Sequence, residues 1–181
     1  MILLVAATDR ELCGHDGLVC GVGPVEAAAS TARALTLHEF SAVLHVGLAG
    51  ARGLAPGALV VGREAVYCDL SAGWPVVDRV AADARLVEVA RSVLPEAPML
   101  PIQTSAAVSG ALADGSSGML VEAMEGFGVL RAAALAGVPA VEVRAISNAL
   151  GEIDRTRWDL DAGLEALERA LPRLVAAVAL A

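Results

Sequence analysis

The residues best suited to chemistry stand in two short motifs, Met124-Glu125-Gly126 and Ser147-Asn148. The first places the carboxylate of Glu125 in an expected helix, with Val121 and Val129 on the same face at four-residue spacing. The second places an amide at the end of an expected apolar strand. A carboxylate against a half-buried wall and an amide at a strand end can hold a sugar and a base. The competing interpretations are a solvated glutamate and an asparagine that caps a turn.

A third candidate group, the carboxylate of Glu11, belongs to a pattern that repeats along the chain. Three apolar runs predict buried strands, and each leads directly into a polar or glycine-rich segment: Ile2–Ala7 before Glu11, Ala42–Val46 before Gly47–Gly50, and Val141–Ile146 before Ser147-Asn148. Ligands of open α/β sheets bind outside the carboxyl ends of the strands. We therefore expect the three segments to meet at one edge of the sheet, although exposure in a polar loop would also explain Glu11.

The remaining elements alternate between strands and helices. Further strands are expected at Leu18–Val22, Ala58–Val61, Ala65–Tyr67 and Met99–Gln103, helices at Val25–Leu37, Ala81–Val93, Gly118–Ala136 and from Asp159 to near the end, and a loop at Ser105–Gly118. Pro172 should kink or break the last helix, whose apolar stripe is Leu160, Leu164, Leu167, Leu171 and Leu174. This order predicts a three-layer αβα fold, with a central mixed, largely parallel sheet, in a single domain over residues 1–181.

The composition excludes several classes of protein. The chain has 181 residues and a net charge of −8, and all 13 basic residues are arginines. Without lysine there is no Schiff-base catalysis and no Walker phosphate loop, and the acidic balance argues against nucleic-acid binding. The chain is 56% hydrophobic but only 3% aromatic, which suggests more apolar surface than a monomer buries and predicts self-association to a homodimer or higher oligomer.

The cysteines, the histidines and the N-terminal run indicate which bound groups and which cellular compartment to expect. The three cysteines form no CxxC pair and the three histidines have no metal-ligand spacing, so we expect no disulfide framework, no metal and no cofactor. The apolar run Met1–Ala7 lacks the basic leader of a signal peptide, and no apolar run reaches membrane-spanning length. These observations predict a cytoplasmic protein without a membrane partner.

Five segments carry a resemblance to a known family. They are Ala6-Ala7-Thr8 through Glu11, Gly21-Val22-Gly23-Pro24-Val25-Glu26-Ala27-Ala28, His45-Val46-Gly47-Leu48-Ala49-Gly50, Met124-Glu125-Gly126 and Arg144-Ala145-Ile146-Ser147-Asn148. The chain resembles the nucleoside phosphorylase and nucleosidase superfamily over nearly its whole length. It is most similar there to the futalosine hydrolases, which release hypoxanthine from futalosine in bacterial menaquinone biosynthesis. The segment from Asp154-Arg155 through Trp158 is similar to that branch in particular.

The resemblance implies roles for individual residues. Catalytic roles fall on Glu11, which would activate water, on Glu125, which would hold the ribose and stabilise its cation, and on Asn148, which would address the base. Substrate contacts fall on Gly47, Met124, Glu125, Ser147 and Asn148. The substrate is expected to be a small nucleoside. Apart from the resemblance, Arg155 and Arg157 beside Trp158 would ordinarily be a surface cluster, but they follow Asn148 closely and could meet an anionic tail on the substrate.

Two departures from related enzymes narrow the implied reaction. His45 and Leu48 stand where a phosphorylase would carry an arginine and a serine for phosphate, so the resemblance favours hydrolysis. Asn148 replaces the aspartate of adenine-releasing nucleosidases and favours a 6-oxopurine. The alternatives are a 5′-methylthioadenosine/S-adenosylhomocysteine-type or inosine-type nucleosidase, and a purine-nucleoside-binding protein without catalysis. The short segment from Cys13 to Gly17, where the family usually has a β-hairpin, keeps the last alternative open.

Overall fold

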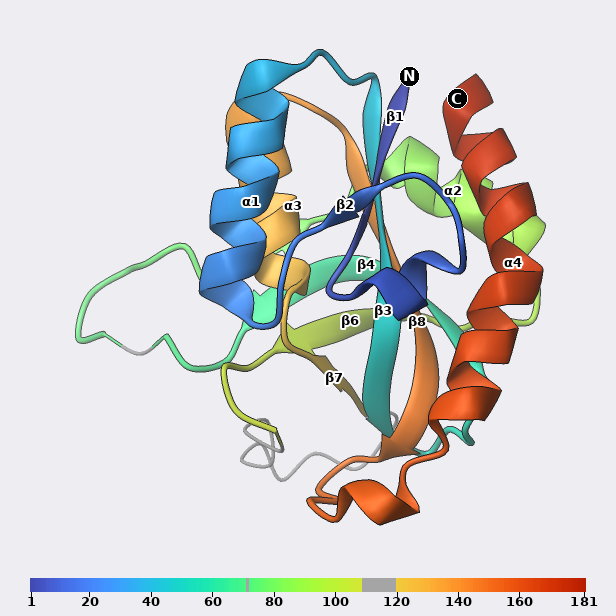
Figure 1. Ribbon diagram of the computed structural model, residues 1–181. Coiled ribbons are helices and arrows are strands. Elements are labelled where there is room, and N and C mark those ends of the chain that lie inside the picture. Colours follow the sequence, from blue (N-terminus) through green and yellow to red (C-terminus); the bar gives the residue numbers. More distant parts are fainter. Residues whose placement is uncertain (71, 109–119) are drawn as a thin grey trace.

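The computed structural model describes residues 1–70, 72–108 and 120–181, and it has three layers. A central sheet is covered on one face by α1 and α3 and on the other by α2 and α4 (Figure 1). These helices span Pro24–Leu37 (α1), Ala84–Val93 (α2), Gly126–Ala136 (α3) and Leu160–Leu180 (α4). The short 3-10 helices η1 and η3 span Asp9–Leu12 and Arg155–Arg157. The predicted αβα architecture is therefore confirmed.

The sheet is mixed and largely parallel, as predicted. In the described part of the chain its strands are β1 Ile2–Ala6, β2 Leu18–Val19, β3 Ala42–Arg52, β4 Leu59–Tyr67, β5 Arg79–Ala81, β6 Met99–Thr104, β7 Leu120–Ala123 and β8 Ala140–Ala149. Five of their eight pairings are parallel, and β3–β7, β4–β5 and β4–β8 are antiparallel. Pairing runs in a closed ring through β3, β8, β4, β6 and β7, so this part of the sheet curls back on itself.

The three strands expected to share an edge are parallel neighbours, in the order β1, β3, β8. Two of them are longer than expected, because β3 and β8 stay in register beyond their apolar runs: Gly47 pairs with Arg144 and Gly50 with Asn148. The expectation that this strand ends at Val46, before Gly47–Gly50, is therefore wrong. Ser147 and Asn148 likewise lie within β8, and a register irregularity follows Ala49 in β3.

The predicted helix Gly118–Ala136 is wrong over its first part. Leu120–Ala123 forms strand β7, and α3 begins only at Gly126, with Glu125 as its N-cap residue. β7 pairs with β3 on one side and with β6 on the other, and these long-range pairings outweigh the helix-favouring composition of the segment. Most of the predicted loop Ser105–Gly118 lies outside the described residues.

Two smaller predictions also need correction. The two expected strands at Ala58–Val61 and Ala65–Tyr67 are one strand, β4, with an irregular register between Gly62 and Glu64. α4 runs unbroken past Pro172. Pro172 is exposed, so water can satisfy the carbonyl group that loses its helical donor. No helix in the described ranges is long and apolar enough to cross a membrane.

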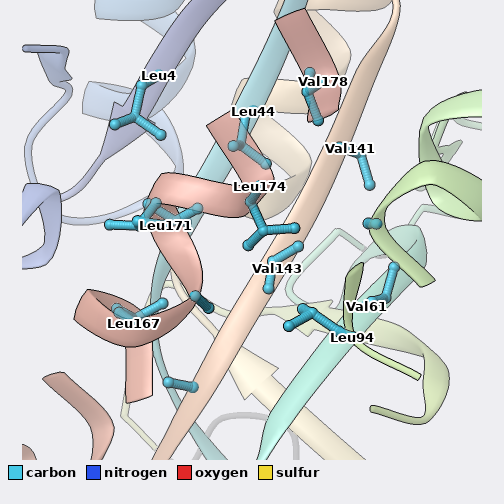
Figure 2. Packing of buried hydrophobic residues seen from close by; sticks show 14 of the residues in the cluster. Leu4, Leu44, Val61, Leu94, Val141, Val143, Leu167, Leu171, Leu174 and Val178 are labelled. Carbon is cyan, nitrogen blue, oxygen red and sulfur yellow. The ribbon is translucent and has the colours of Figure 1, made fainter. Parts of the chain in front are cut away.

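A buried aliphatic layer fixes α2 and α4 against the sheet. Leu171 and Leu174 of α4 join Leu44 of β3 and Val143 of β8 in this cluster (Figure 2). Full burial of each such side chain stabilises the fold by ~1.5–3 kcal/mol. The start of the same α4 stripe, Leu160 and Leu164, is only partly buried and faces a pocket instead. The layer thus holds the strand ends and the start of α4 in fixed relation.

Candidate functional site

A pocket of about 320 Å³ lies at the shared edge of β1, β3 and β8. Its lining residues come from the segment after β1, from β3, β7 and β8, and from η3 and the start of α4: Ala7, Thr8, Arg10, Glu11, Val22, Leu48, Ala49, Gly50, Ala107, Val108, Glu122, Ala123, Met124, Glu125, Ser147, Asn148, Arg155, Trp158, Leu160 and Leu164. This set includes five of the six predicted site residues, namely Glu11, Met124, Glu125, Ser147 and Asn148. The expectation that separate strand ends deliver candidate groups to one place is therefore met.

Gly47 is the predicted residue that does not line this pocket. A Cβ atom at this position would lie 2.8 Å from Oε1 of Glu11 and would also collide with the guanidinium group of Arg144. Gly47 therefore sits behind the pocket wall, where only glycine leaves room for these two side chains. Its substrate contact stays a prediction, and the structure shows a packing role for it.

Glu11 is held rigidly by three hydrogen-bond donors. The backbone N–H and the hydroxyl of Thr8 donate to Oε2 at 2.9 and 2.6 Å, and the N–H of Leu48 donates to Oε1 at 2.9 Å. The single turn η1 places the carboxylate back over Thr8, and Glu11 is only 7% exposed. The interpretation of Glu11 as an exposed loop residue is therefore wrong.

Glu125 is also buried, at 4% exposure, but in a different way from the prediction. It does not share a helix face with Val121, because Val121 belongs to β7. The N–H of Gly23 donates to Oε1 at 3.1 Å, and Nη2 of Arg144 forms an ion pair with Oε2 at 3.4 Å. The solvated-glutamate interpretation of Glu125 is therefore wrong.

Ser147 and Asn148 complete the predicted set, side by side on β8. The hydroxyl of Ser147 lies 2.8 Å from Oδ1 of Asn148 and 3.3 Å from the carbonyl oxygen of Ala49. Nδ2 of Asn148 donates to the carbonyl oxygen of Ala149 at 3.0 Å. An amide group has two N–H bonds and an oxygen with two lone pairs, so Asn148 keeps capacity to bind a ligand in the pocket.

A buried charged cluster that the sequence analysis did not predict lies beneath these residues. Arg144 is fully buried, and its Nε donates to Oε1 of Glu142 at 2.7 Å. Its Nη1 donates to the carbonyl oxygen of Leu48 at 3.4 Å, and its Nη2 reaches both Glu125 and the ring of His45. Arg144 therefore joins the pocket wall to the interior of the sheet.

The tautomer of His45 follows from its two partners. Nδ1 lies 3.1 Å from the carbonyl oxygen of Val5, which can only accept, so Nδ1 carries the proton. Nε2 then offers its lone pair to Nη2 of Arg144 at 2.5 Å. Burial, together with the positive charge of Arg144, holds the pKa of His45 well below its usual value. His45 is thus a neutral acceptor that positions the arginine.

Burial and neighbouring charges affect the pKa values of Arg144 and Glu142 differently. Burial lowers the pKa of Arg144, but Glu142 and Glu125 outweigh this effect and hold the pKa above its usual value, so the arginine stays charged. Burial raises the pKa of Glu142, and Arg144 only partly offsets the rise. Oε2 of Glu142 has no hydrogen-bond partner, which leaves this carboxylate half satisfied. Among the described residues, no group of His, Cys, Asp or Glu is placed to hold a metal ion.

One sequence signal could have revealed this cluster. Glu142 and Arg144 are separated by one residue within an apolar strand, and a period of two puts both side chains on the same face. Two charged residues on one face of a strand that is buried on both sides must be paired with each other. Glu122, which also lines the pocket and is buried, was hidden by the incorrect helix prediction.

The raised pKa of Glu142 predicts a pH-dependent stability. In the folded protein Glu142 keeps its proton at pH values where the unfolded chain has lost it, so the associated stability is full below the ordinary pKa of 4.5 and is lost as pH rises through the folded value. A Glu142→Gln variant does not titrate and still offers an amide oxygen to Arg144. We expect its free energy of unfolding, relative to wild type, to increase as pH rises.

Urea unfolding of both proteins from about pH 4.5 to about pH 8.5 measures this difference. Glu96→Gln is the matched control, because Glu96 is exposed and the same change there removes an equal charge. The prediction fails if the Glu142→Gln difference is flat, falls with pH, or matches that of Glu96→Gln.

The chain also matches known proteins. The family model of the phosphorylase superfamily matches residues 17–180. Among solved structures, a 5′-methylthioadenosine/S-adenosylhomocysteine nucleosidase from Neisseria meningitidis superposes with a TM-score of 0.84 at 18% identity, covering 96% of this chain and 97% of that one. At this identity the likeness shows the fold alone. The chain thus has the fold of this superfamily.

Two curated relatives define a narrower group. The futalosine hydrolase of Streptomyces coelicolor is 39% identical over an alignment of 186 positions, which covers 89% of this chain and 78% of that protein. The futalosine hydrolase of Acidothermus cellulolyticus is 36% identical over 194 positions, covering 95% and 80%. The chain therefore belongs to the phosphorylase superfamily and, within it, to the futalosine hydrolase family. The resemblance noted in the sequence is confirmed.

Proposed function

We propose that this protein hydrolyses the N-glycosidic bond of futalosine and releases hypoxanthine. The futalosine hydrolase relatives, which align over more than three quarters of their length, support this reaction. They also confirm the predicted enzyme class, an N-glycosyl hydrolase acting on a purine nucleoside. The structural observation that carries the proposal is a pocket in which two buried carboxylates, Glu11 and Glu125, are fixed by hydrogen bonds and face the same cavity.

Glycosidic cleavage develops positive charge on the ribose, and the two carboxylates suit that change. Glu125 binds the ribose hydroxyls and stabilises the sugar cation. Glu11 accepts a proton from a water molecule, whose oxygen then bonds to C1′. The electron pair of the broken C1′–N9 bond leaves with the base, which takes a proton from solvent.

Asn148 addresses the base. One N–H of its amide is bonded to the carbonyl oxygen of Ala149, and the remaining N–H can donate to N7 or to O6 of a 6-oxopurine, both of which are acceptors. An amide cannot supply the proton that a departing adenine needs at N7, so hypoxanthine is the favoured leaving group. Ser147 fixes the amide orientation through its contact with Oδ1 of Asn148.

The pocket favours water over phosphate. Leu48 presents an apolar side chain to the pocket where a phosphorylase would carry a serine, and its N–H is already bonded to Glu11. The buried cation Arg144 is occupied by Glu142, Glu125 and His45. The floor therefore presents carboxylates rather than free donors to an anion, which repels phosphate.

Purified protein should release hypoxanthine from futalosine in the absence of phosphate, at a rate that added phosphate does not raise. Chromatography of the products also measures turnover of the 6-amino analogue of futalosine, of 5′-methylthioadenosine and of inosine. We expect futalosine to give the highest kcat/KM. The 6-amino compound lacks the O6 acceptor. We expect the loss of this hydrogen bond to lower its kcat/KM by about 10–100-fold.

Other outcomes would assign the protein elsewhere. Faster adenine release from 5′-methylthioadenosine indicates the adenine-type nucleosidase, and ribose 1-phosphate in the products indicates a phosphorylase. Tight futalosine binding without any cleavage indicates a nucleoside-binding protein. Self-association to a homodimer or higher oligomer and a cytoplasmic location stay predictions from the sequence.

A further inference from the structure

The outer part of the pocket differs chemically from its floor. Glu11, Glu125 and Asn148 supply polar groups at the strand ends, whereas Trp158, Leu160 and Leu164 supply apolar surface from η3 and α4. Exposed Arg10 and Arg155 also line this outer part. A ligand that fills the whole pocket must therefore be polar at one end and apolar, with negative charge, at the other.

Arg155 stands out because its neighbours leave it without a carboxylate partner. The nearby acids Glu152 and Asp154 both pair with Arg157, at 3.2 and 3.8 Å. Among the residues that the structure describes, Arg155 forms no ion pair, and its guanidinium group lies 5.6 Å from the ring centre of Trp158. Arg155 thus keeps its full charge for a ligand.

The segment that carries Arg155 is held in place by its own contacts. Nε1 of Trp158 donates to the carbonyl oxygen of Glu152 at 2.9 Å, and Asp154 accepts from the N–H of Thr156 at 3.0 Å. The N–H of Asp159 donates to the carbonyl oxygen of Ser147 at 2.8 Å, which ties the segment to β8 beside Asn148. The backbone that carries Arg155 is therefore held near the base-binding amide before any ligand binds.

From this placement we propose that Arg155 and the ring of Trp158 form a subsite for an aromatic carboxylate on the 5′ side of the nucleoside. The inference rests on the proposed function, because futalosine carries a benzoate group on that side. With the base at Asn148 and the ribose between Glu11 and Glu125, the tail extends along Trp158. A flat ring stacks on the indole, and the guanidinium group binds the carboxylate.

Arg10 adds a second positive charge to the same subsite, with a smaller contribution to binding than that of Arg155. Among the residues that the structure describes, Arg10 forms an ion pair with Asp161 at 3.9 Å, and both side chains are largely exposed. Such a surface pair contributes little and is easily exchanged for a ligand carboxylate. The two arginines therefore discriminate between nucleosides by the charge of the tail.

The test compares Arg155→Gln with Arg157→Gln on futalosine and on its methyl ester, in which the tail is neutral. Arg157 was also expected to be able to meet the tail, but it does not line the pocket. It is the matched control because it lies two residues from Arg155 and has the same charge. For a partly exposed charge-assisted contact we expect Arg155→Gln to raise KM for futalosine by about tenfold with little change in kcat. The preference of wild type for futalosine over the ester, also about tenfold, should disappear. Arg157→Gln should retain that preference.

The subsite is wrong, and the proposed function stands, if wild type hydrolyses futalosine and its ester equally well or if both variants behave alike. The proposed function is wrong if wild type cleaves neither compound. In that event the subsite is still tested by the binding of benzoate, which is measured by the quenching of tryptophan fluorescence. Loss of quenching in Arg155→Gln but not in Arg157→Gln supports it, and equal quenching in all three proteins refutes it.

Discussion

Replacing Glu11 by Gln is expected to lower kcat for futalosine by about 10²–10⁴-fold, the range over which general bases contribute. In the proposed mechanism the carboxylate accepts the proton of the attacking water, and an amide cannot accept it. The variant will also lose stability, because both oxygens of Glu11 accept from backbone N–H groups. In either orientation the glutamine NH₂ faces one of those donors, at a cost of about 1–3 kcal/mol.

A Thr8→Val variant separates these two effects. It removes the hydroxyl that donates to Glu11 and preserves both the carboxylate and the shape of the side chain. We expect a loss of about 0.5–1.5 kcal/mol in the free energy of unfolding and less than a tenfold fall in kcat. The comparison uses the steady-state kcat of Thr8→Val and of Glu11→Gln, measured well below the melting temperatures of both variants. Glu11 is not the base if Thr8→Val and Glu11→Gln lose the same fraction of kcat.

The parts of the fold that the sequence predicted are those with continuous apolar runs. β1 and the first halves of β3 and β8 read as buried strands, and the rule for parallel strand ends then placed Glu11 and Asn148 together. Their second halves contain glycine, serine and asparagine, which have low strand propensity in isolation. They are strands because each pairs with a neighbour already in register.

Long-range pairing also explains why the surroundings of Glu125 were mispredicted. The residues of β7 favour a helix locally, and only β3 and β6 hold them extended. Long-range contacts also explain why the burial of Arg144 was not predicted. Local composition assigns charged residues to the surface, whereas the partners His45 and Glu125 that satisfy Arg144 come from distant parts of the sequence. The candidate site residues could be located from the sequence. For the cluster that holds them, the spacing of Glu142 and Arg144 was a local signal, whereas the distant partners His45 and Glu125 could not be assigned to it.

Glu125→Gln is the second substitution with a large expected effect, because in the proposed mechanism its charge faces the ribose where the cation forms. Removing one preorganised stabilising group lowers kcat by about 10²–10³-fold. The structure also predicts a loss of stability. Glu125 accepts from the N–H of Gly23 and pairs with Arg144, so an amide NH₂ must face one of these donors. The free energy of unfolding should fall by about 1–3 kcal/mol.

The matched control is Glu142→Gln, which replaces another carboxylate partner of Arg144 at a position that does not line the pocket. Glu142 pairs with Nε of Arg144 and is fully buried, whereas Glu125 pairs with Nη2 and lines the cavity. If Glu125 acts by contact with the sugar, kcat falls in Glu125→Gln and stays within about tenfold of wild type in Glu142→Gln. Stopped assays of hypoxanthine release, with urea unfolding of the same samples, measure both quantities. Equal losses of kcat in the two variants would mean that Glu125 matters only as a partner of Arg144, and the ribose-binding role would then be wrong.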